Sequence, residues 1–338
     1  MAGWEGYGDK ARPPGIRARR ERALRTRRRG RTRERSFAPL EERAFEDGEH
    51  KLRPLLSVRD RDCYVLHALH GDTTQTVNDK LCRLLFFAAT LRDHGAGRVT
   101  VVCPYLCYAR KDRRTKSRDP VTTRYVARAI EAMGVDRMVA LEPHNAAAFD
   151  NAFRIPAERI HARGPLVAAL LGHVGEAPVA VVSPDTGGAK RAAALRADLA
   201  ARTGREPTSA FLEKYRSAGV VSGDAVVGDV DGRVAVIVDD LVASGTTVLR
   251  AVRACRERGA TAVYAVATHG VFAAGAERLF GEAALERLLI TDSVTPRMEQ
   301  HWGGRVERVS VAPLLADVIR ALGRGGSLTD VLEPPASG

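Results

Sequence analysis

An apolar run that ends in two acids offers the clearest chemistry in the chain. The segment VIVDDLVASGTTV places Asp239 and Asp240 directly after this run, and small residues follow before a helical pattern begins. Two adjacent carboxylates repel each other, so they need hydroxyl donors or a cation nearby. The small residues let backbone N–H groups and the positive end of the next helix approach a phosphate. These features indicate a sugar-phosphate site, although the same spacing also fits a tight turn capped by Ser244 and Thr246.

The elements that must position these acids are strands and helices that alternate from about residue 50 onward. Short continuous apolar runs predict strands at 63–69, 98–106, 136–144, 178–185, 207–214, 233–240, 261–270 and 287–293. Helical patterns separate most of these runs, which predicts parallel sheets that are covered on both faces. The fold class that we expect is therefore α/β, with two doubly wound parallel-sheet domains. Ligands of such sheets bind beyond the carboxyl ends of the strands, where the two acids lie.

The basic character of the chain is concentrated at its start. The net charge is +12, and the first 35 residues hold twelve arginines and one lysine against four acidic residues. This segment has no apolar periodicity that a core could bury, so we expect residues 1–36 to be disordered or aberrant. Three interpretations stay open: a solvated tail, an arm that binds RNA or another polyanion, and a misread segment of the gene. Nucleic acid is expected to bind only through this tail.

Several function classes are disfavoured by what the sequence lacks. It contains no GxxxxGK[ST], GxGxxG or HExxH motif, which disfavours a P-loop kinase, a Rossmann dehydrogenase and a zincin. Its apolar runs are shorter than the roughly 18 residues that span a membrane. The five cysteines form no CxxC pair, as is typical of reduced core thiols. With no signal peptide visible, we expect a cytoplasmic protein.

Nine segments, in order, give the chain a resemblance to one family. They are FEDGE, PYLCYARKDRRTKSRDPVTTRYVA, EPHNAAAFDNAFRIPAERIHA, VVSPDTGGAKRAA, EKYR, GDVDGRVAVIVDDLVASGTT, ATHGVF, TDSVTP and VSVAPLLADVIR. Together they resemble ribose-phosphate diphosphokinase, also called phosphoribosyl-pyrophosphate synthetase, over roughly residues 45–332. The resemblance implies Mg²⁺-dependent transfer of the diphosphoryl group of ATP to the C1 hydroxyl of ribose 5-phosphate. It also implies phosphoribosyltransferase-type domains at 37–163 and 164–307, with 308–332 packing back on the first.

The resemblance also implies a role for individual residues. The ATP-binding residues would be Phe45, Asp47, Glu49, Arg110, Lys111, Asp112 and His144. The ribose-5-phosphate-binding residues would be Asp185, Asp239, Asp240, Ala243, Ser244, Gly245, Thr246 and Thr247. His144 and Asp185 would also serve the metal. Lys214 and Arg216 would be the catalytic cations on a mobile loop, because positioned cations stabilise the charge that builds during phosphoryl transfer.

Four departures from the family pattern keep other functions open. Lys111 replaces a glutamine, Pro143 follows Glu142 where the family has Asp-Leu-His, and Ala243 replaces an aspartate. The arginine-rich tail stands where the family has an opening strand and helix, so a strand of the first domain would be left unpaired. A non-catalytic regulatory paralogue and a phosphoribosyltransferase are the alternatives. Family members form homo-oligomers built from dimers, commonly hexamers, and we expect a homo-oligomer here.

Overall fold

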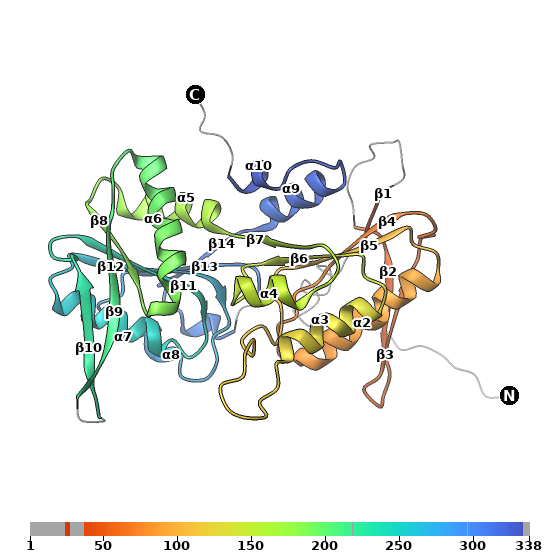
Figure 1. Ribbon diagram of the computed structural model, residues 1–338, viewed down its shortest axis with the longest axis horizontal. Coiled ribbons are helices and arrows are strands. Elements are labelled where there is room, and N and C mark those ends of the chain that lie inside the picture. The colour runs from red at the N-terminus through yellow and green to blue at the C-terminus, as the bar shows by residue number, and fades with distance from the viewer. Residues whose placement is uncertain (1–23, 28–36, 218–219, 296, 334–338) are drawn as a thin grey trace, which may run out of the picture.

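Two parallel-rich sheets, each flanked by helices, form the body of the molecule (Figure 1). The computed structural model describes residues 24–27, 37–217, 220–295 and 297–333. Strands and helices alternate through most of this length. The α/β class with doubly wound parallel sheets, expected from the apolar runs, is confirmed.

The first sheet has five strands in the order β1-β4-β5-β6-β7. Its strands are β1 (Leu24–Arg27), β4 (Asp62–Leu66), β5 (Arg98–Cys103), β6 (Arg137–Leu141) and β7 (Ala157–Ile160). Neighbours from β4 to β7 pair in parallel, and β1 pairs antiparallel with β4. The helices of this half are α2 (Val77–Asp93), α3 (Thr122–Ala132) and α4 (Ala146–Ala152). A separate hairpin of β2 (Leu40–Ala44) and β3 (His50–Pro54) packs against α2.

The second sheet has seven strands in the order β10-β9-β8-β11-β12-β13-β14. Its strands are β8 (Val179–Ser183), β9 (Thr208–Ser217), β10 (Val220–Gly228), β11 (Val234–Val242), β12 (Ala262–Gly270), β13 (Arg287–Thr291) and β14 (Val306–Val309). All neighbours pair in parallel except β9 and β10. The helices and 3₁₀ turns of this half are α5 (Arg163–Val174), η1 (Thr186–Gly188), α6 (Ala189–Thr203), α7 (Thr246–Glu257), α8 (Glu277–Phe280), η2 (Glu299–His301), α9 (Ala312–Leu322) and α10 (Thr329–Leu332).

The two sheets share a core on one face of each. Side chains of successive strand residues point to opposite faces, so each strand contributes residues to two hydrophobic clusters. Val101 packs with α2 and α3, and Ile237 packs with α7 and α8. Their neighbours Val102 and Val236 lie in a third cluster, together with residues of α5, α6 and α9. Figure 1 shows α5 and α9 above the junction of the two sheets. Because this cluster crosses the boundary expected at 163/164, the division into two domains stays a prediction.

The structure differs from the sequence-based expectation at the start of the first sheet. Leu24–Arg27 forms β1 and covers the edge of β4 that we expected to be unpaired. Backbone groups at a strand edge can pair with any extended chain, so an arginine-rich segment can supply the partner. The remaining residues of the expected tail lie outside the described residues.

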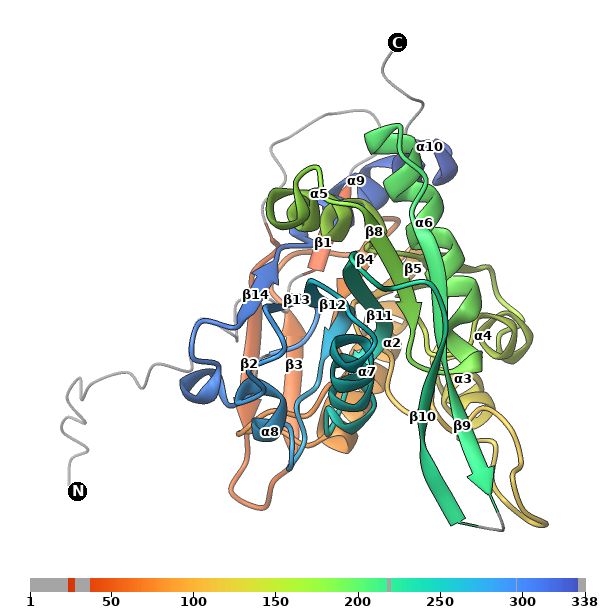
Figure 2. The same cartoon turned by 90° about the vertical axis from the view of Figure 1, so that its left-hand side faces the viewer.

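A second difference concerns the segment expected to be a mobile loop. The strand predicted at 207–214 is present as β9, but it continues to Ser217 and is followed by β10 in place of a loop. The two strands form an antiparallel hairpin that extends beyond the sheet in Figures 1 and 2. The glycine- and serine-rich composition suggested a loop, but Leu212 and Val226, which face each other in the register, are both buried. The strands β2, β3, β7 and β14 are further additions to the predicted set.

Membrane and disulfide features can be stated for the described residues. None of the helices described is long and apolar enough to cross a membrane. All five cysteines are free thiols; Cys82 is exposed and the others are buried.

Candidate functional site

A cavity of about 1020 Å³ lies where the two halves meet, beyond the carboxyl ends of β6, β8 and β11. Twelve of the predicted site residues line it: Arg110, Lys111, Asp112, His144, Asp185, Asp239, Asp240, Ala243, Ser244, Gly245, Thr246 and Thr247. The first four come from the first half of the chain and the others from the second. The fold therefore brings four of the predicted ATP-binding residues and all of the predicted ribose-5-phosphate-binding residues to one cavity, where their roles remain predictions.

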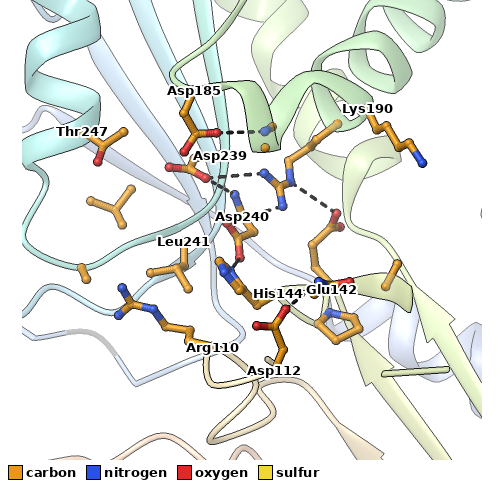
Figure 3. A pocket seen from close by; sticks show the side chains of 18 of the residues that line it. Arg110, Asp112, Glu142, His144, Asp185, Lys190, Asp239, Asp240, Leu241 and Thr247 are labelled. Carbon is orange, nitrogen blue, oxygen red and sulfur yellow. Dashed lines mark hydrogen bonds and ion pairs between the residues drawn. The ribbon is translucent and has the colours of Figure 1, made fainter. Parts of the chain in front are cut away.

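Asp239 and Asp240 lie inside β11, not at its end as the sequence suggested. On one side β11 stays paired with β12 as far as Val242, but its pairing with β8 stops at Ile237. The sheet therefore opens on the β8 side immediately before the two acids. Figure 3 shows both side chains in this opening, beside Asp185. The carboxylates have room for a ligand because one neighbouring strand ends, while the other holds their backbone in place.

A histidine and an arginine face the acid pair. His144 Nδ1 donates to Asp240 Oδ2 at 2.6 Å. The Arg191 guanidinium lies 3.5 Å from Asp239 Oδ1 and 3.4 Å from Asp240 Oδ1. The side chain of Asp240 is only 5% exposed, so these partners compensate a carboxylate that has lost most of its water.

The two neighbouring carboxyls have pKa shifts in opposite directions. Burial raises the pKa of Asp239 to about 7, and the adjacent Asp240 carboxylate adds to this effect. Burial acts in the same direction on Asp240, but the hydrogen bond from His144 and the charge of Arg191 lower the pKa of Asp240 below its usual value. The hydrogen bond to Asp240 in turn raises the pKa of His144. One carboxylate of the pair is therefore firmly ionised, and the other can carry a proton near neutral pH.

The turn after β11 leaves a helix end open toward the cavity. Gly245 is the N-cap of α7 at φ 73°, and no side chain makes a capping hydrogen bond there. The hydroxyls of Ser244 and Thr246 lie 3.1 Å apart and bond to each other. The side-chain cap that a purely structural turn would have used is thus not formed. The first backbone N–H groups of a helix without such a cap suit an anion.

Ala243, which stands where the family pattern has an aspartate, contacts the rest of the structure through its backbone. Its carbonyl accepts a hydrogen bond from Ala273 N at 3.0 Å, and the carbonyl of Val242 accepts one from Phe272 N at 3.0 Å. These bonds fix the loop against the segment after β12. The loop therefore keeps its shape without a carboxylate at position 243.

The first half contributes a strained turn and a capped helix to the cavity. Glu142, directly after β6 and before Pro143, has φ 44°, which brings the chain sharply round to His144. Asn145 Nδ2 donates to Asp112 Oδ2 at 2.5 Å, and Asn145 Oδ1 accepts from Ala148 N to cap α4. The chain therefore makes a left-handed turn just beyond β6, immediately before Pro143.

The ammonium group of Lys111 is engaged by residues of its own loop. Its ammonium lies 2.7 Å from Asp119 Oδ2 and 3.3 Å from the hydroxyl of Thr115, within the loop that follows β5. Asp119 also accepts from the Thr115 and Lys116 backbone N–H groups. The extra positive charge at position 111 is therefore largely used to order its own loop.

Five predicted residues are not among those shown to line the cavity. Phe45, Asp47 and Glu49 lie at the exposed turn between β2 and β3, and none of them lines the cavity. Asp47 Oδ1 accepts from Glu49 N at 3.0 Å, and the Arg43 guanidinium lies 4.8 Å from the centre of the Phe45 ring. The side chains of Lys214 and Arg216, on β9, lie outside the described residues.

Sequence reasoning missed two residues of the site, Glu142 and Arg191. Both line the cavity, and Arg191 Nε lies 3.9 Å from Glu142 Oε1. Burial raises the pKa of Glu142, which Arg191 opposes. The available signals were weak: Glu142 is one acid of the EPHN segment, and Arg191 is one of two cations after SPDTGG. Neither pattern reveals that the two side chains meet.

Metal binding by protein side chains alone is not indicated in the described part of the chain. No group of three or more His, Cys, Asp or Glu side chains there is placed to hold an ion. Asp185 Oδ1 accepts from Gly188 N at 2.9 Å, and its side chain lies at the cavity with His144. Such a sparse set suits Mg²⁺, which keeps several waters and takes one or two carboxylates together with substrate phosphates.

Comparison with known proteins gives the same family from both ends of the chain. Residues 31–134 match the family described as the N-terminal domain of ribose phosphate pyrophosphokinase, and residues 220–332 match the phosphoribosyl synthetase-associated domain. Ribose-phosphate pyrophosphokinase of Vibrio cholerae is 35% identical over 287 residues, which cover 84% of this chain and 88% of that protein. The Listeria ivanovii protein of the same name is 34% identical, covering 86% and 87%.

A solved structure agrees with the sequence comparisons. The crystal structure of phosphoribosylpyrophosphate synthetase from Mycobacterium smegmatis superimposes with a TM-score of 0.76 at 31% identity, covering 86% of this chain and 92% of that one. The likeness therefore extends over most of both sheets. With relatives above 30% identity along most of its length, the chain belongs to the ribose-phosphate pyrophosphokinase family of enzymes.

Proposed function

We propose that the protein transfers the diphosphoryl group of ATP to the C1 hydroxyl of ribose 5-phosphate, giving phosphoribosyl pyrophosphate and AMP. In this step the C1 oxygen bonds to the β-phosphorus, the bond from that phosphorus to the α–β bridging oxygen breaks, and the proton of the C1 hydroxyl is released to solvent. The observation that carries the proposal is the single cavity in which an acid pair and an uncapped helix end face basic residues of the other half. The family of the chain makes this reaction the first to test.

Ribose 5-phosphate would bind on the β11–α7 side of the cavity. Asp239 and Asp240 would accept hydrogen bonds from the ribose hydroxyls, because their oxygens lie in the opening beside β8. The 5-phosphate would lie at the start of α7, where Ser244, Gly245, Thr246 and Thr247 line the cavity. Bonds from hydroxyls and backbone N–H groups, together with the helix dipole, would stabilise the dianion.

ATP would bind on the first-half side, beside Arg110, Asp112 and His144. The turn that carries Phe45, Asp47 and Glu49 does not line this cavity. We propose that the adenine site lies between subunits, with this turn supplied by a second copy of the chain. An exposed aromatic ring and acids on a projecting hairpin suit such an exchange, because a base can stack on the ring while the acids accept from its amino group.

Mg²⁺ fits the cavity when ATP brings phosphate oxygens. Asp185 would supply an oxygen ligand, and His144 has its Nδ1 engaged with Asp240, which leaves Nε2 for the ion or the phosphates. The ion, when bound, would neutralise charge that builds on the diphosphoryl group. Lys214 and Arg216, proposed as the catalytic cations, would stabilise the same charge from β9. The same proposal places the protein in the cytoplasm, where ATP and sugar phosphates are available.

The proposal can be tested with purified protein, ATP, Mg²⁺ and ribose 5-phosphate. We expect AMP and phosphoribosyl pyrophosphate in equal amounts, and a loss of about 100-fold or more in kcat for Lys214→Ala. Arg196→Ala is the matched control, because Arg196 pairs with Glu206 on α6 outside the cavity. A folded wild-type protein that turns over no faster than Lys214→Ala would refute the enzymatic function and favour a regulatory paralogue. Consumption of phosphoribosyl pyrophosphate with a nucleobase would instead identify a phosphoribosyltransferase.

A further inference from the structure

Arg191 joins three carboxylates that come from both halves of the molecule. Its Nη1 and Nη2 lie near Asp239 and Asp240, at 3.5 Å and 3.4 Å, and its Nε lies 3.9 Å from Glu142. Each guanidinium nitrogen therefore faces a different carboxylate. Figure 3 shows Glu142, Asp239 and Asp240 turned toward the same point between α6 and the turn after β6.

The position of Arg191 on its helix indicates that these contacts are needed. Arg191 lies in the first turn of α6, where the helix dipole disfavours a positive charge. Its neighbour Lys190 points away from the acids in Figure 3, so the two cations do not replace each other. The side chain of Arg191 is 20% exposed, and those of Asp239 and Glu142 are 21% and 17% exposed. Partly buried carboxylates in such a group repel one another strongly unless a cation lies among them.

Among the side chains that the structure describes, no other cation contacts all three acids. The other charged or titratable groups that act on these acids or on His144 are Tyr105, Arg110, Asp112, Arg163 and His269. His144 reaches Asp240 only, and Arg163 is paired with Asp198 at 2.9 Å. Burial lowers the pKa of His269 to about 4, so its ring is neutral. Arg191 is therefore the group that ties the acids of β11 to the first half.

We propose that Arg191 is a positioning residue, which holds the Asp239–Asp240 pair and Glu142 in one arrangement so that the pair can receive the hydroxyls of ribose 5-phosphate. The inference rests on the proposed function and deepens it, since it names what aligns the two halves around the sugar. Arginine suits this role because its planar fork can meet several carboxylates at once, whereas the single ammonium of lysine cannot. Without the guanidinium the three acids would repel, move apart or take up protons.

The test compares Arg191→Met and Arg191→Lys with the wild type. Arg196→Met is the control, since it removes another paired arginine of the same helix outside the cavity. We expect Arg191→Met to weaken ribose 5-phosphate binding, measured by calorimetry, about tenfold or more, and to raise its KM to a similar extent. KM for ATP should change less than about threefold. Arg191→Lys should recover only part of the loss.

A second readout separates positioning from simple packing. The pKa values of Asp239 and Glu142 are already raised in the folded protein, and in Arg191→Met they should rise further. The melting temperature of this variant should therefore fall more steeply than that of the wild type as pH increases. The gap to the wild type should widen from pH 5 to pH 9. The melting-temperature gap between Arg191→Lys and the wild type should widen less with pH, because lysine keeps the positive charge. The same measurement on Arg191→Lys also tests the inference if Arg191→Met does not fold.

Two results would overturn the inference. One is ribose 5-phosphate affinity of Arg191→Met within about twofold of that of Arg196→Met. The other is a melting-temperature gap that stays constant with pH, which would show that the side chain only fills space. A wild-type protein that binds ribose 5-phosphate but makes no phosphoribosyl pyrophosphate would refute the proposed function alone, because binding and the pH-dependent gap are measured without turnover.

Discussion

Adjacent residues of one strand, Asp239 and Asp240, have different electrostatic surroundings. Asp240 accepts from His144 and faces Arg191, so its carboxylate is stabilised although it is buried. Asp239 has only the more distant contact with Arg191 and accepts the Asp240 backbone N–H at 2.8 Å. A carboxyl with a raised pKa can donate its proton or accept one near neutral pH, which suits a ribose hydroxyl as partner.

The first prediction concerns Asp239→Asn. The pKa of Asp239 is about 7 in the folded protein and near 4 when unfolded, so the folded state binds more protons between these values. Wild-type stability should therefore fall as pH rises from about 4 to about 7. Asparagine cannot ionise, so the variant does not lose this free energy of unfolding. The free energy of unfolding of Asp239→Asn relative to wild type should therefore increase between about pH 4 and pH 7, by on the order of 1–3 kcal/mol, and stay constant above that range. Its kcat/KM for ribose 5-phosphate should drop about tenfold or more.

Urea unfolding at several pH values measures this effect. Asp229→Asn is the control, because Asp229 is an exposed carboxylate paired with Arg233 outside the cavity. The stability of Asp229→Asn relative to wild type should not increase comparably as pH rises. A stability difference for Asp239→Asn that is the same at pH 5 and pH 8 would show that Asp239 is not the group with the raised pKa.

At the scale of elements, the site depends on where β8 and β11 separate and on how α7 begins. The sheet opens because β8 ends at Ser183, while β11 continues beside β12. Gly245 then turns the chain into α7 with a positive φ of 73°. A Cβ at this position would lie 3.1 Å from Leu279 Cβ, so α8 closes the space behind the turn. Only glycine fits both the backbone conformation and the space.

The second prediction, Gly245→Ala, separates these two requirements. Gly204→Ala is its matched control: Gly204 also has a positive φ, 66°, but a Cβ there would meet nothing within 4 Å. The control should lose about 1 kcal/mol of unfolding free energy from the backbone alone. Gly245→Ala should lose roughly 2–3 kcal/mol, because crowding against Leu279 is added. It should also raise KM for ribose 5-phosphate, since the start of α7 must shift. Equal losses for the two variants would contradict the close packing against α8.

At the scale of the whole molecule, the two halves are held together by a common core and meet at one cavity. The cluster shared by both sheets includes α5, which connects the halves in sequence, and α9, which returns from the end of the second sheet. Loss of packing in this cluster would disturb both sheets at once. The hairpin of β2 and β3 takes no part in this cavity, since none of its residues, those of its turn included, line it.

The third prediction follows from the proposal that this turn serves a second copy. Phe45→Ala and Asp240→Asn should each give an inactive or nearly inactive protein when assayed alone. If each site combines the cavity of one chain with the turn of another, random mixing after co-expression should leave about one quarter of the sites intact. The activity of the mixture, compared with that of each variant, measures this fraction. A mixture no more active than the better variant would show that the turn and the cavity act within one chain.

The sequence by itself determined the α/β class and the position of the principal acids. Continuous apolar runs made the strands recognisable, because strands buried on both faces must be apolar throughout. The acids after the run in β11 and the small residues that follow indicated a sugar-phosphate site before any contact was known. Local propensity failed where pairing with another strand decides the structure, as for β1 and β10.

Only the tertiary structure decided which charges meet. His144 and Asp240 are 96 residues apart, and Arg191 and Asp239 are 48 apart, yet each pair is in contact. Sequence spacing carries no information about such pairs, because contacts between strands and helices depend on how the sheets are stacked and where a neighbouring strand ends. Sequence spacing also could not show that Phe45, Asp47 and Glu49 lie at an exposed turn that does not line the cavity. The sequence shows which chemical groups the side chains carry, but tertiary packing determines which of these groups meet.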